Sequence, residues 1–222
     1  MPRSAIFDLD GTLADTAADL IGAANALLQA DGLRELDPKT ARATAGRGGK
    51  ALMSLGFETA GHPKTSAEID ALFPAYLKAY QTRIDAETRL FDGVIETLEE
   101  LTKAGWALGV CTNKPEHLAI DLLPRLGLDR FFPVVLGADT LPVRKPDPRH
   151  VWETIDRLGA PRSRAVMIGD SVTDRDAARN AEIPVILVSF GYSVTPPASL
   201  KPDVLIDRYD QLIPALERLS PA

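Results

Sequence analysis

Asp8 and Asp10 are the first side chains of the chain with a clear chemical use. They follow the short apolar run 5–7, and Gly11 comes directly after them. This order predicts a buried strand that ends in a loop carrying two carboxylates. Carboxylates can ligate a cation, exchange a proton or attack an electrophile, but paired aspartates also occur in ordinary turns. The pair alone therefore does not define a site.

Further polar groups follow later apolar runs of the chain. They are Thr112, Asn113 and Lys114 after the run 107–111, Arg144 and Lys145 downstream of 134–136, and Asp170, Ser171 and Asp174 after 164–168. In an open parallel sheet, ligands bind outside the carboxyl ends of the strands. We therefore expect these side chains to gather at one edge of a sheet.

The group formed in this way combines carboxylates with a hydroxyl, an amide and ammonium groups. Clustered carboxylates are costly to bury unless a cation joins them, and Mg²⁺ is suited to a few carboxylates, water and a substrate phosphate. A lysine and a hydroxyl beside such a cation can hold a phosphoryl group. In contrast, no His and Cys residues have the spacing of a zinc site, and the strand ends suggest no Ser-His-Asp arrangement.

From residue 90 onward, short apolar runs alternate with helical patterns. The predicted strands are 107–111, 134–136, 164–168, 185–188 and 204–206, and the predicted helices are 94–103, 115–126, 148–158, 172–181 and 209–219. Pro124 should end or kink its helix, because proline lacks the amide hydrogen and crowds the preceding turn. This alternation is typical of βαβ units in a parallel sheet covered on both faces.

Between the first strand and this region lies a block with helical patterns, in which we expect no strand between about residues 14 and 88. Thr65 and Glu68 have the spacing of a capping box before an amphipathic stripe. We therefore predict an α/β fold with a doubly wound parallel sheet formed by residues 1–13 and 90–222, and an all-α insertion of residues 14–89.

The composition is that of an ordinary globular protein. Of 222 residues, 45% are hydrophobic and 25% are charged, which disfavours disorder, coiled coil and collagen-like structure. The 25 basic and 31 acidic side chains leave a net charge of −6, which gives no general attraction to nucleic acid or to an anionic membrane. Cys111 is the only cysteine, so no intrachain disulfide can form.

The sequence also carries no signal for a membrane or for export. No apolar run approaches the roughly 18 residues of a spanning helix. Asp8 interrupts the start of the chain before a signal-peptide core could form. We therefore expect a cytoplasmic protein that has neither nucleic acid nor a membrane as a partner.

Four motifs at the predicted strand ends together resemble those of haloacid dehalogenase-type hydrolases. They are Asp8-Leu9-Asp10-Gly11-Thr12-Leu13, similar to the DxDGT signature, then Val110-Cys111-Thr112-Asn113-Lys114-Pro115, Lys145-Pro146-Asp147-Pro148, and Ile168-Gly169-Asp170-Ser171 with Asp174. The resemblance extends over essentially the whole chain, and four ordered motifs are far more specific than one. The chain departs from the pattern at Glu182, where relatives commonly have glycine.

For the chemistry, the resemblance implies that Asp8 is the nucleophile, which attacks phosphorus and forms an aspartyl-phosphate. It implies that Asp10 is the general acid that protonates the leaving oxygen and then the base that activates water. Lys145 would neutralise Asp8 and the transferring phosphoryl group, and Thr112 would bind the phosphoryl oxygens with help from Asn113. This division agrees with physical chemistry, since a cation and a lysine favour the ionised form of a nucleophilic carboxylate.

For the cofactor, the resemblance implies Mg²⁺ held by the carboxylates of Asp8 and Asp170 and by the backbone carbonyl of Asp10. Asp174 would support this metal from behind the ligands or reach it through water. The alternative for Asp174 is a carboxylate in the first turn of a helix, which the helix dipole favours.

The inserted block, residues 14–89, resembles the helical cap that this family often carries after its first motif. Such a cap would close over the site, exclude water and select the leaving group. Its segment Gly46-Arg47-Gly48-Gly49-Lys50 is similar in placement to the substrate-facing loop of phosphoglycolate phosphatase-like caps. We hypothesise that Arg47, more than Lys50, contacts an anionic part of the substrate. The alternative is a flexible, solvated basic loop.

These inferences favour a Mg²⁺-dependent phosphatase, similar to phosphoglycolate phosphatase, that hydrolyses a small phosphorylated metabolite. A phosphosugar mutase or a pyrophosphatase on the same scaffold is an alternative, although Gly11-Thr12-Leu13 looks like the hydrolase version of the motif. From a different class, a phosphoryl-accepting receiver would collect similar residues, but it would lack the inserted block. A non-catalytic binding module would leave the catalytic set without a use.

Overall fold

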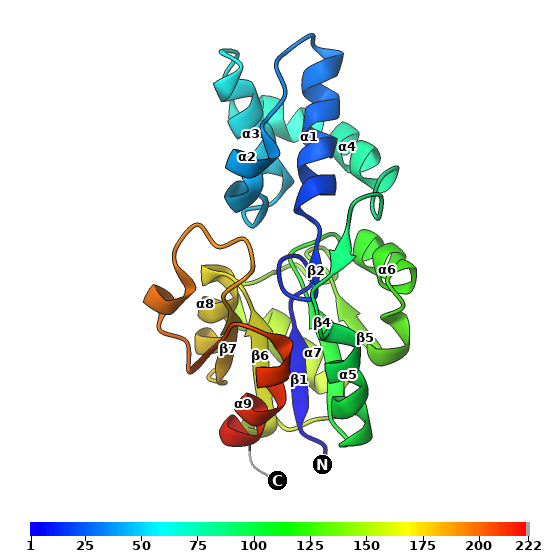
Figure 1. Ribbon diagram of the computed structural model, residues 1–222, viewed down its shortest axis with the longest axis vertical. Coiled ribbons are helices and arrows are strands. Elements are labelled where there is room, and N and C mark those ends of the chain that lie inside the picture. The colour runs from blue at the N-terminus through cyan, green and yellow to red at the C-terminus, as the bar shows by residue number, and fades with distance from the viewer. Residues whose placement is uncertain (221–222) are drawn as a thin grey trace. The chain divides into compact units, whose positions relative to one another are not determined.

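The computed structural model describes residues 1–220, which form two compact units. The first unit comprises Met1–Ala14 and the chain from Leu90 onward, and the second comprises Asp15–Arg89 (Figure 1). Within residues 1–220, none of the helices combines the length and the apolar character that a membrane crossing requires.

A six-stranded parallel sheet forms the centre of the first unit. Its strands are β1 Ser4–Phe7, β4 Ala107–Cys111, β5 Val134–Leu136, β6 Ala165–Gly169, β7 Val185–Val188 and β8 Val204–Ile206, in the spatial order β5-β4-β1-β6-β7-β8. The chain order runs outward from β1 in both directions, which confirms the predicted doubly wound α/β fold. The carboxyl end of β1 therefore lies at a switch point of the sheet, where such folds bind ligands.

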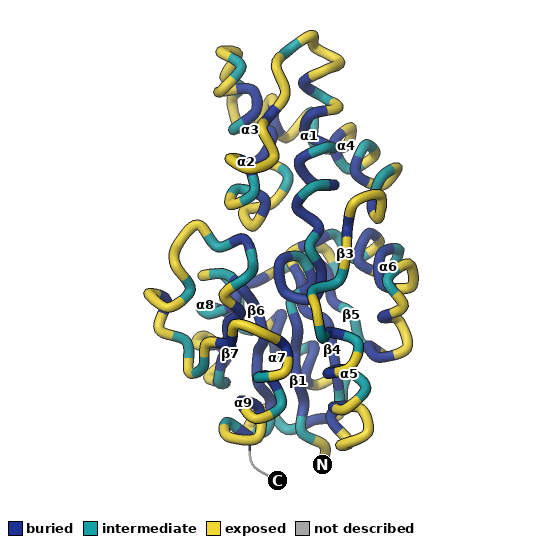
Figure 2. Tube along the Cα trace, in the orientation of Figure 1, coloured by how far each residue is buried: buried dark blue, intermediate teal, exposed yellow. Residues whose placement is uncertain are grey.

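The strands form where the sequence has short, continuous apolar runs. β1, β6 and β7 are buried at every residue, and Figure 2 shows the centre of the sheet in the colour of buried residues. β4, β5, β7 and β8 span the residues predicted for them, whereas β6 begins one residue later than predicted. The shift arises because Arg164 belongs to the preceding 3₁₀ turn.

Helices pack on both faces of this sheet. They are α5 Val94–Lys103, α6 Glu116–Arg125, α7 Pro148–Arg157, α8 Val172–Asn180 and α9 Leu212–Leu219, with 3₁₀ turns at Asp129–Phe131, Arg162–Arg164, Pro197–Leu200 and Tyr209–Gln211. One core cluster joins Val151 of α7 and Ala177 of α8 to Ile6 and Met167 of the sheet. Figure 1 shows α5 and α9 on the opposite face from α7. α6 passes through Pro124 and ends at the next residue, in agreement with the predicted effect of the proline.

The departure from the family pattern at Glu182 falls on a left-handed residue. Glu182 has a φ of 58°, and the amides of Glu182 and Ile183 donate to Arg179 and Ala178 to close the end of α8. Glycine adopts this conformation without steric cost, whereas a residue with a side chain is strained by roughly 1 kcal/mol. The turn is thus retained in this chain with a less suitable residue.

The second unit is helical in the residues that the structure describes. Its helices are α1 Ala17–Ala30, α2 Pro38–Ala45, α3 Gly49–Thr59 and α4 Ser66–Gln81, and α1 contacts the other three. The hydroxyl of Tyr76 on α4 donates to the carbonyl of Leu20 on α1 at 3.2 Å, so this buried polar atom is satisfied within the core. Thr65 and Glu68 form the capping box that their spacing predicts at the start of α4.

The prediction that no strand lies between about residues 14 and 88 is wrong at its edge. Ala14–Asp15 forms β2, which pairs with β3 at Arg89–Leu90. Strands of two residues carry no alternation that periodicity could reveal. This β2–β3 pair stands where the chain passes from the first unit to the second and returns.

Asp19, in the first turn of α1, connects the beginning of the second unit to its end. Its carboxylate is fully buried and accepts hydrogen bonds from the amide and hydroxyl of Thr88, each at 2.8 Å, and from the amide of Glu87 at 3.0 Å. Arg83 adds an ion pair at 3.3 Å. These contacts fix the segment that leads into β3.

Candidate active site

Asp8 stands directly after β1, at the centre of the carboxyl edge of the sheet. Its amide donates to the carbonyl of Ile168 at 2.9 Å, so the strand pairing continues to this residue, and the Leu9 amide donates to its carboxylate at 2.8 Å. The chain then turns through Gly11, whose φ of 82° suits glycine. The turn places the Asp8 carboxylate at the edge where the sequence predicts a site.

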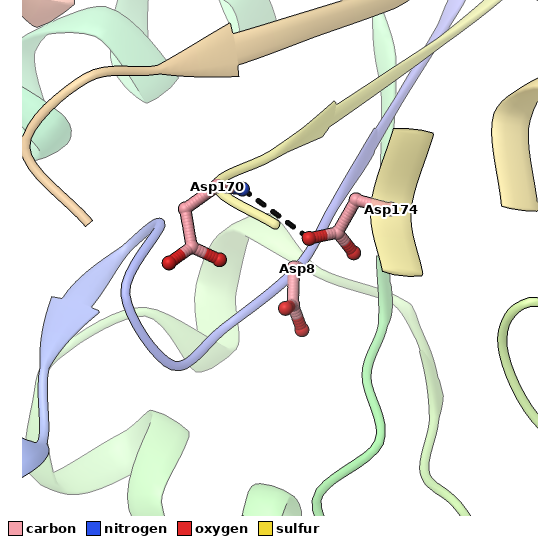
Figure 3. A group of neighbouring side chains, drawn as sticks. All are labelled: Asp8, Asp170 and Asp174. Atoms are coloured by element: carbon pink, nitrogen blue, oxygen red, sulfur yellow. Dashed lines mark hydrogen bonds between the residues drawn. The ribbon is translucent and has the colours of Figure 1, made fainter. Parts of the chain in front are cut away.

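Three carboxylates from separate elements meet here. Asp8 follows β1, Asp170 follows β6 and Asp174 lies in the first turn of α8, and one oxygen of each lies within 4.8 Å of the others. Figure 3 shows the three carboxyl groups close together, with the amide of Asp170 donating to Asp174. The structure thus brings together three of the residues that the sequence places at the strand ends.

Asp174 accepts more hydrogen bonds than Asp8 or Asp170 does. One of its oxygens accepts from the Ser171 hydroxyl at 2.6 Å, the Ser171 amide at 3.1 Å and the Asp170 amide at 3.2 Å. The other accepts from the Lys145 ammonium at 2.6 Å. A carboxylate offers about four lone-pair sites, so these bonds use most of its capacity. Asp174 therefore completes the capping box with Ser171 at the start of α8 and forms the ion pair with Lys145.

Lys145 lies between two of the carboxylates. Its ammonium is 3.1 Å from Asp8 and 2.6 Å from Asp174, and its side chain is 1% exposed. Burial alone would lower the pKa of Lys145, but the charges of Asp174 and Asp8 outweigh it and hold that pKa well above its ordinary value. The side-chain amide of Asn113 donates to the Lys145 carbonyl at 3.0 Å, so Asn113 fixes the backbone that carries the lysine.

The positive charge of Lys145 does not fully balance the negative charges of the buried carboxylates. Burial raises the pKa of Asp8 to about 6, with Asp174 and Asp10 adding repulsion that Lys145 only partly offsets. Burial also raises the pKa of Asp170 well above its ordinary value, with Asp174 and Asp8 contributing. A divalent cation would favour the ionised forms of both groups, and the oxygen donors present are those that Mg²⁺ prefers. The residues therefore fit the metal ion that the sequence implies.

Asp10 has its own lysine. The ammonium of Lys114, whose side chain is 2% exposed, lies 3.0 Å from one oxygen of Asp10 and 3.2 Å from the other. Sequence reasoning placed Lys114 at this edge but gave it no role, because the ion pair depends on how the loops after β1 and β4 face each other. Thr112, on the same loop, is buried, and its hydroxyl accepts from the Lys114 amide at 3.2 Å.

The loop after β7 supplies residues that sequence reasoning missed. The Tyr192 amide donates to Asp170 at 2.7 Å. A Cβ atom on Gly191 would lie 2.3 Å from the Cβ of Asp170, and one on Gly11 would lie 2.5 Å from a carboxylate oxygen of Asp170. Two glycines thus let the backbone approach this carboxylate on both sides. The signal was available, since the strand 185–188 also ends at the carboxyl edge.

Arg47 and Lys50 belong to the second unit. Arg47 is exposed in the turn between α2 and α3, and its amide donates to the Thr44 carbonyl at 2.9 Å. The ammonium of Lys50 pairs with Asp70 at 2.6 Å and lies 5.0 Å from the centre of the Phe73 ring. The charge of Lys50 is therefore used within its own unit.

Cys111 and His150 form a buried pair behind the site. The Nε2 atom of His150 donates to the Gly137 carbonyl at 3.0 Å, which leaves Nδ1 to face the Cys111 sulfur at 3.5 Å. Burial raises the pKa of the Cys111 thiol to about 12 and, with the charge of Lys145, lowers that of His150 to about 4. Both groups are therefore neutral near pH 7.

This pair makes folding stability depend on pH. Between the ordinary His pKa of about 6.5 and the lowered value of about 4, the unfolded chain binds a proton that folded His150 does not. The contribution of neutral His150 to the free energy of unfolding is fully present above about pH 6.5 and is lost as the pH falls towards about 4. From pH 7 to pH 5, we expect the wild type to lose about 2 kcal/mol more than His150→Gln.

Urea unfolding of the two proteins at both pH values measures this difference. Asp8 and Asp170, whose raised pKa values act in the opposite direction, are present in both proteins and cancel. Equal responses to pH in the two proteins would contradict the assignment of neutral His150.

The comparisons with known proteins agree on one family. Residues 5–188 match the haloacid dehalogenase-like hydrolases. The chain is 43% identical over 212 residues to a phosphoglycolate phosphatase of Agrobacterium fabrum, covering 96% of this chain and 91% of that protein. It is 46% identical over 203 residues to a phosphoglycolate phosphatase of Caulobacter vibrioides, covering 91% and 86%.

Solved structures share the fold over nearly the whole chain. The crystal structure of a predicted phosphoglycolate phosphatase from Haemophilus somnus gives a TM-score of 0.88 at 28% identity, covering 96% of this chain and 97% of that one. CbbY from Rhodobacter sphaeroides, solved in complex with phosphate, gives 0.78 at 25% identity and covers 96% of each. The chain therefore belongs to the haloacid dehalogenase-like hydrolase family.

Proposed function

We propose that this phosphoric monoester hydrolase removes the phosphoryl group from a small anionic ester, phosphoglycolate or a compound like it, through a covalent intermediate on Asp8. The observation that carries the proposal is the buried ammonium of Lys145, which lies 3.1 Å from Asp8 in a cluster of carboxylates that fits a divalent cation. Relatives named phosphoglycolate phosphatase, at 43% and 46% identity, support the choice of substrate.

In the first step, a carboxylate oxygen of Asp8 forms a bond to phosphorus while the bond from phosphorus to the ester oxygen breaks. Asp10, in its acid form, gives its proton to that oxygen, and the alcohol leaves. The ammonium of Lys145 and the hydroxyl of Thr112 bind the phosphoryl oxygens, whose charge grows in the transition state. The product of this step is aspartyl-phosphate with Asp10 as a carboxylate.

In the second step, Asp10 takes a proton from a water molecule, and the water oxygen bonds to phosphorus. The bond between phosphorus and Asp8 breaks, and its electron pair returns to the Asp8 carboxylate. Inorganic phosphate leaves, and Asp10 again carries the proton with which the cycle began.

Asp8 and Asp170, with the backbone carbonyl of Asp10, would hold Mg²⁺. When bound, the metal supplies positive charge to the carboxylates and to the phosphoryl oxygens. Asp174 is assigned to Lys145 and to the start of α8, since both of its oxygens already accept hydrogen bonds. It thus holds the lysine beside Asp8 without serving as a metal ligand.

Removal of the metal tests the proposal. With excess EDTA, hydrolysis of para-nitrophenyl phosphate should fall by roughly a thousandfold, because metal ions stabilise such transition states by several kcal/mol. Added Mg²⁺ should restore many turnovers per enzyme. Chelator-resistant hydrolysis would contradict the metal, and release of a single equivalent of phosphate would contradict a phosphatase. Isomerisation of a sugar 1-phosphate without phosphate release would instead indicate a mutase.

We assign Arg47 the recognition of an anionic group on the substrate, since its exposed guanidinium contrasts with Lys50, which is paired to Asp70. Replacing Arg47 with alanine should raise the KM for phosphoglycolate by about 10- to 100-fold, as expected for a hydrogen bond between charged groups. The kinetics with para-nitrophenyl phosphate should change by less than about threefold. Lys50→Ala is the matched control, and equal losses for both esters in Arg47→Ala would count against this role.

A further inference from the structure

Lys114 is a buried cation that the chemistry proposed above does not use. It follows β4, and its side chain is 2% exposed. Its backbone is held on both sides, because its amide donates to the Thr112 hydroxyl at 3.2 Å and its carbonyl accepts from the Ala138 amide at 2.9 Å. Burying an ammonium costs several kcal/mol unless a partner is in place. The loop after β4 therefore holds Lys114 in a defined position.

The partner of this ammonium is the carboxylate of Asp10. The distances are 3.0 and 3.2 Å to the two oxygens, so the ammonium lies against both. Asp10 is 21% exposed at its side chain and sits in the turn after β1. Contact with both oxygens restrains the orientation of the carboxyl group.

The two buried lysines of the edge contact different carboxylates. Lys145 contacts Asp8 and Asp174, and Lys114 contacts Asp10. The groups proposed to attack phosphorus and to move the proton are thus oriented by different cations on different loops. Removing one lysine should disturb one of these functions more than the other.

We propose that Lys114 is a positioning residue, which orients the carboxyl group of Asp10 for proton transfer to the leaving oxygen and from water. The proposal rests on the function proposed for Asp10 above. Lys114 acts through Asp10, so its contribution depends on how much the reaction needs the proton. A misplacement of about 1 Å can cost a hundredfold in rate.

Leaving groups of different basicity separate this role from a merely structural one. An alkoxide needs the proton in order to leave, whereas para-nitrophenolate leaves without it. In Lys114→Met, formation of aspartyl-phosphate from ethyl phosphate should slow by about a hundredfold. Formation from para-nitrophenyl phosphate should slow by less than about fivefold, so a burst of para-nitrophenolate should precede a slow steady state set by the second step. The dissociation constants of both esters, taken from the substrate dependence of the quench rates, should change little.

The experiment measures both esters by rapid quench in the wild type, Lys114→Met, Lys114→Arg and Lys103→Met, an exposed lysine that serves as the control for loss of charge. Thermal unfolding of each protein reports on the fold. Lys114→Arg keeps the charge with a different shape, so it should fold and show the same preference for the aryl ester in a weaker form. This variant keeps the test valid if Lys114→Met fails to fold.

A double-mutant cycle adds an independent test. If Lys114 acts through Asp10, then adding Lys114→Met to Asp10→Asn should slow the reaction by less than about twofold further. Equal slowing of both esters by Lys114→Met, or full additivity with Asp10→Asn, would overturn the proposal. A rise in KM for phosphoglycolate alone would also overturn it, because Lys114 would then bind the substrate. If the wild type shows no turnover that Asp8→Asn abolishes, the function proposed above is refuted instead.

Discussion

Replacing Asp8 with asparagine is expected to reduce turnover by at least about 10⁴-fold, because the side chain that bonds to phosphorus is lost. The fold should not suffer. Burial raises the pKa of Asp8 to about 6, so a neutral side chain is less costly to bury there, and Lys145 keeps its ion pair with Asp174. Phosphate release measures turnover. The mass of acid-quenched protein should reveal a phosphorylated wild type and an unmodified Asp8→Asn variant.

Two controls complete this test. Asp121→Asn makes the same chemical change at a partly exposed residue that pairs with Arg125, and it should retain wild-type turnover. Asp8→Glu keeps the charge but moves it by one methylene, so it should lose most activity if position matters. Retention of more than about a tenth of wild-type turnover by Asp8→Asn would contradict a nucleophilic Asp8.

Replacing Asp19 with alanine is expected to lower the free energy of unfolding by about 3 to 5 kcal/mol, the typical cost of breaking a buried ion pair. The carboxylate is fully buried, and its loss would leave the amides of Glu87 and Thr88 and the Arg83 guanidinium without this acceptor. Each buried donor left unsatisfied costs about 1 to 3 kcal/mol. Urea unfolding monitored by far-UV circular dichroism gives the value.

Asp70→Ala is the matched control for Asp19→Ala. Asp70 also forms an ion pair, with Lys50 at 2.6 Å, but both side chains are more than half exposed. Exposed pairs contribute about 0 to 1 kcal/mol because water screens them. A loss of stability in Asp19→Ala no larger than that in Asp70→Ala would show that the hydrogen bonds of Asp19 do not hold the segment before β3.

The sheet could be predicted because its strands are buried. A strand covered on both faces must be apolar throughout, so runs such as 107–111 and 185–188 stand out between polar segments. β2 and β3 could not be predicted, since each has two residues and no apolar run of its own. They form because the chain passes this point twice, which is a property of the fold and not of a local pattern.

The members of the candidate site could be predicted for a related reason. Parallel strands bring their carboxyl ends to one edge, so Asp8 and Asp170 are expected at the same edge, and the adjacency of β1 and β6 in the structure makes them neighbours. The ion pairs between the lysines and the carboxylates of the site could not be predicted. Which lysine faces which carboxylate depends on loop conformation, and the contribution of Gly191 depends on a close approach that becomes visible only in three dimensions.

The β2–β3 pair has a consequence for how such a protein can evolve. The chain leaves the first unit at β2 and returns to it at β3, and these two strands are hydrogen-bonded to each other. Because the two ends of the segment Asp15–Arg89 are adjacent, this junction tolerates insertion and exchange of the segment. Asp8, Lys114, Lys145 and Asp170 all lie outside this segment. A descendant could acquire a different segment at this junction and keep the same catalytic residues. One part of the gene could then change while the part that encodes the chemistry stays the same.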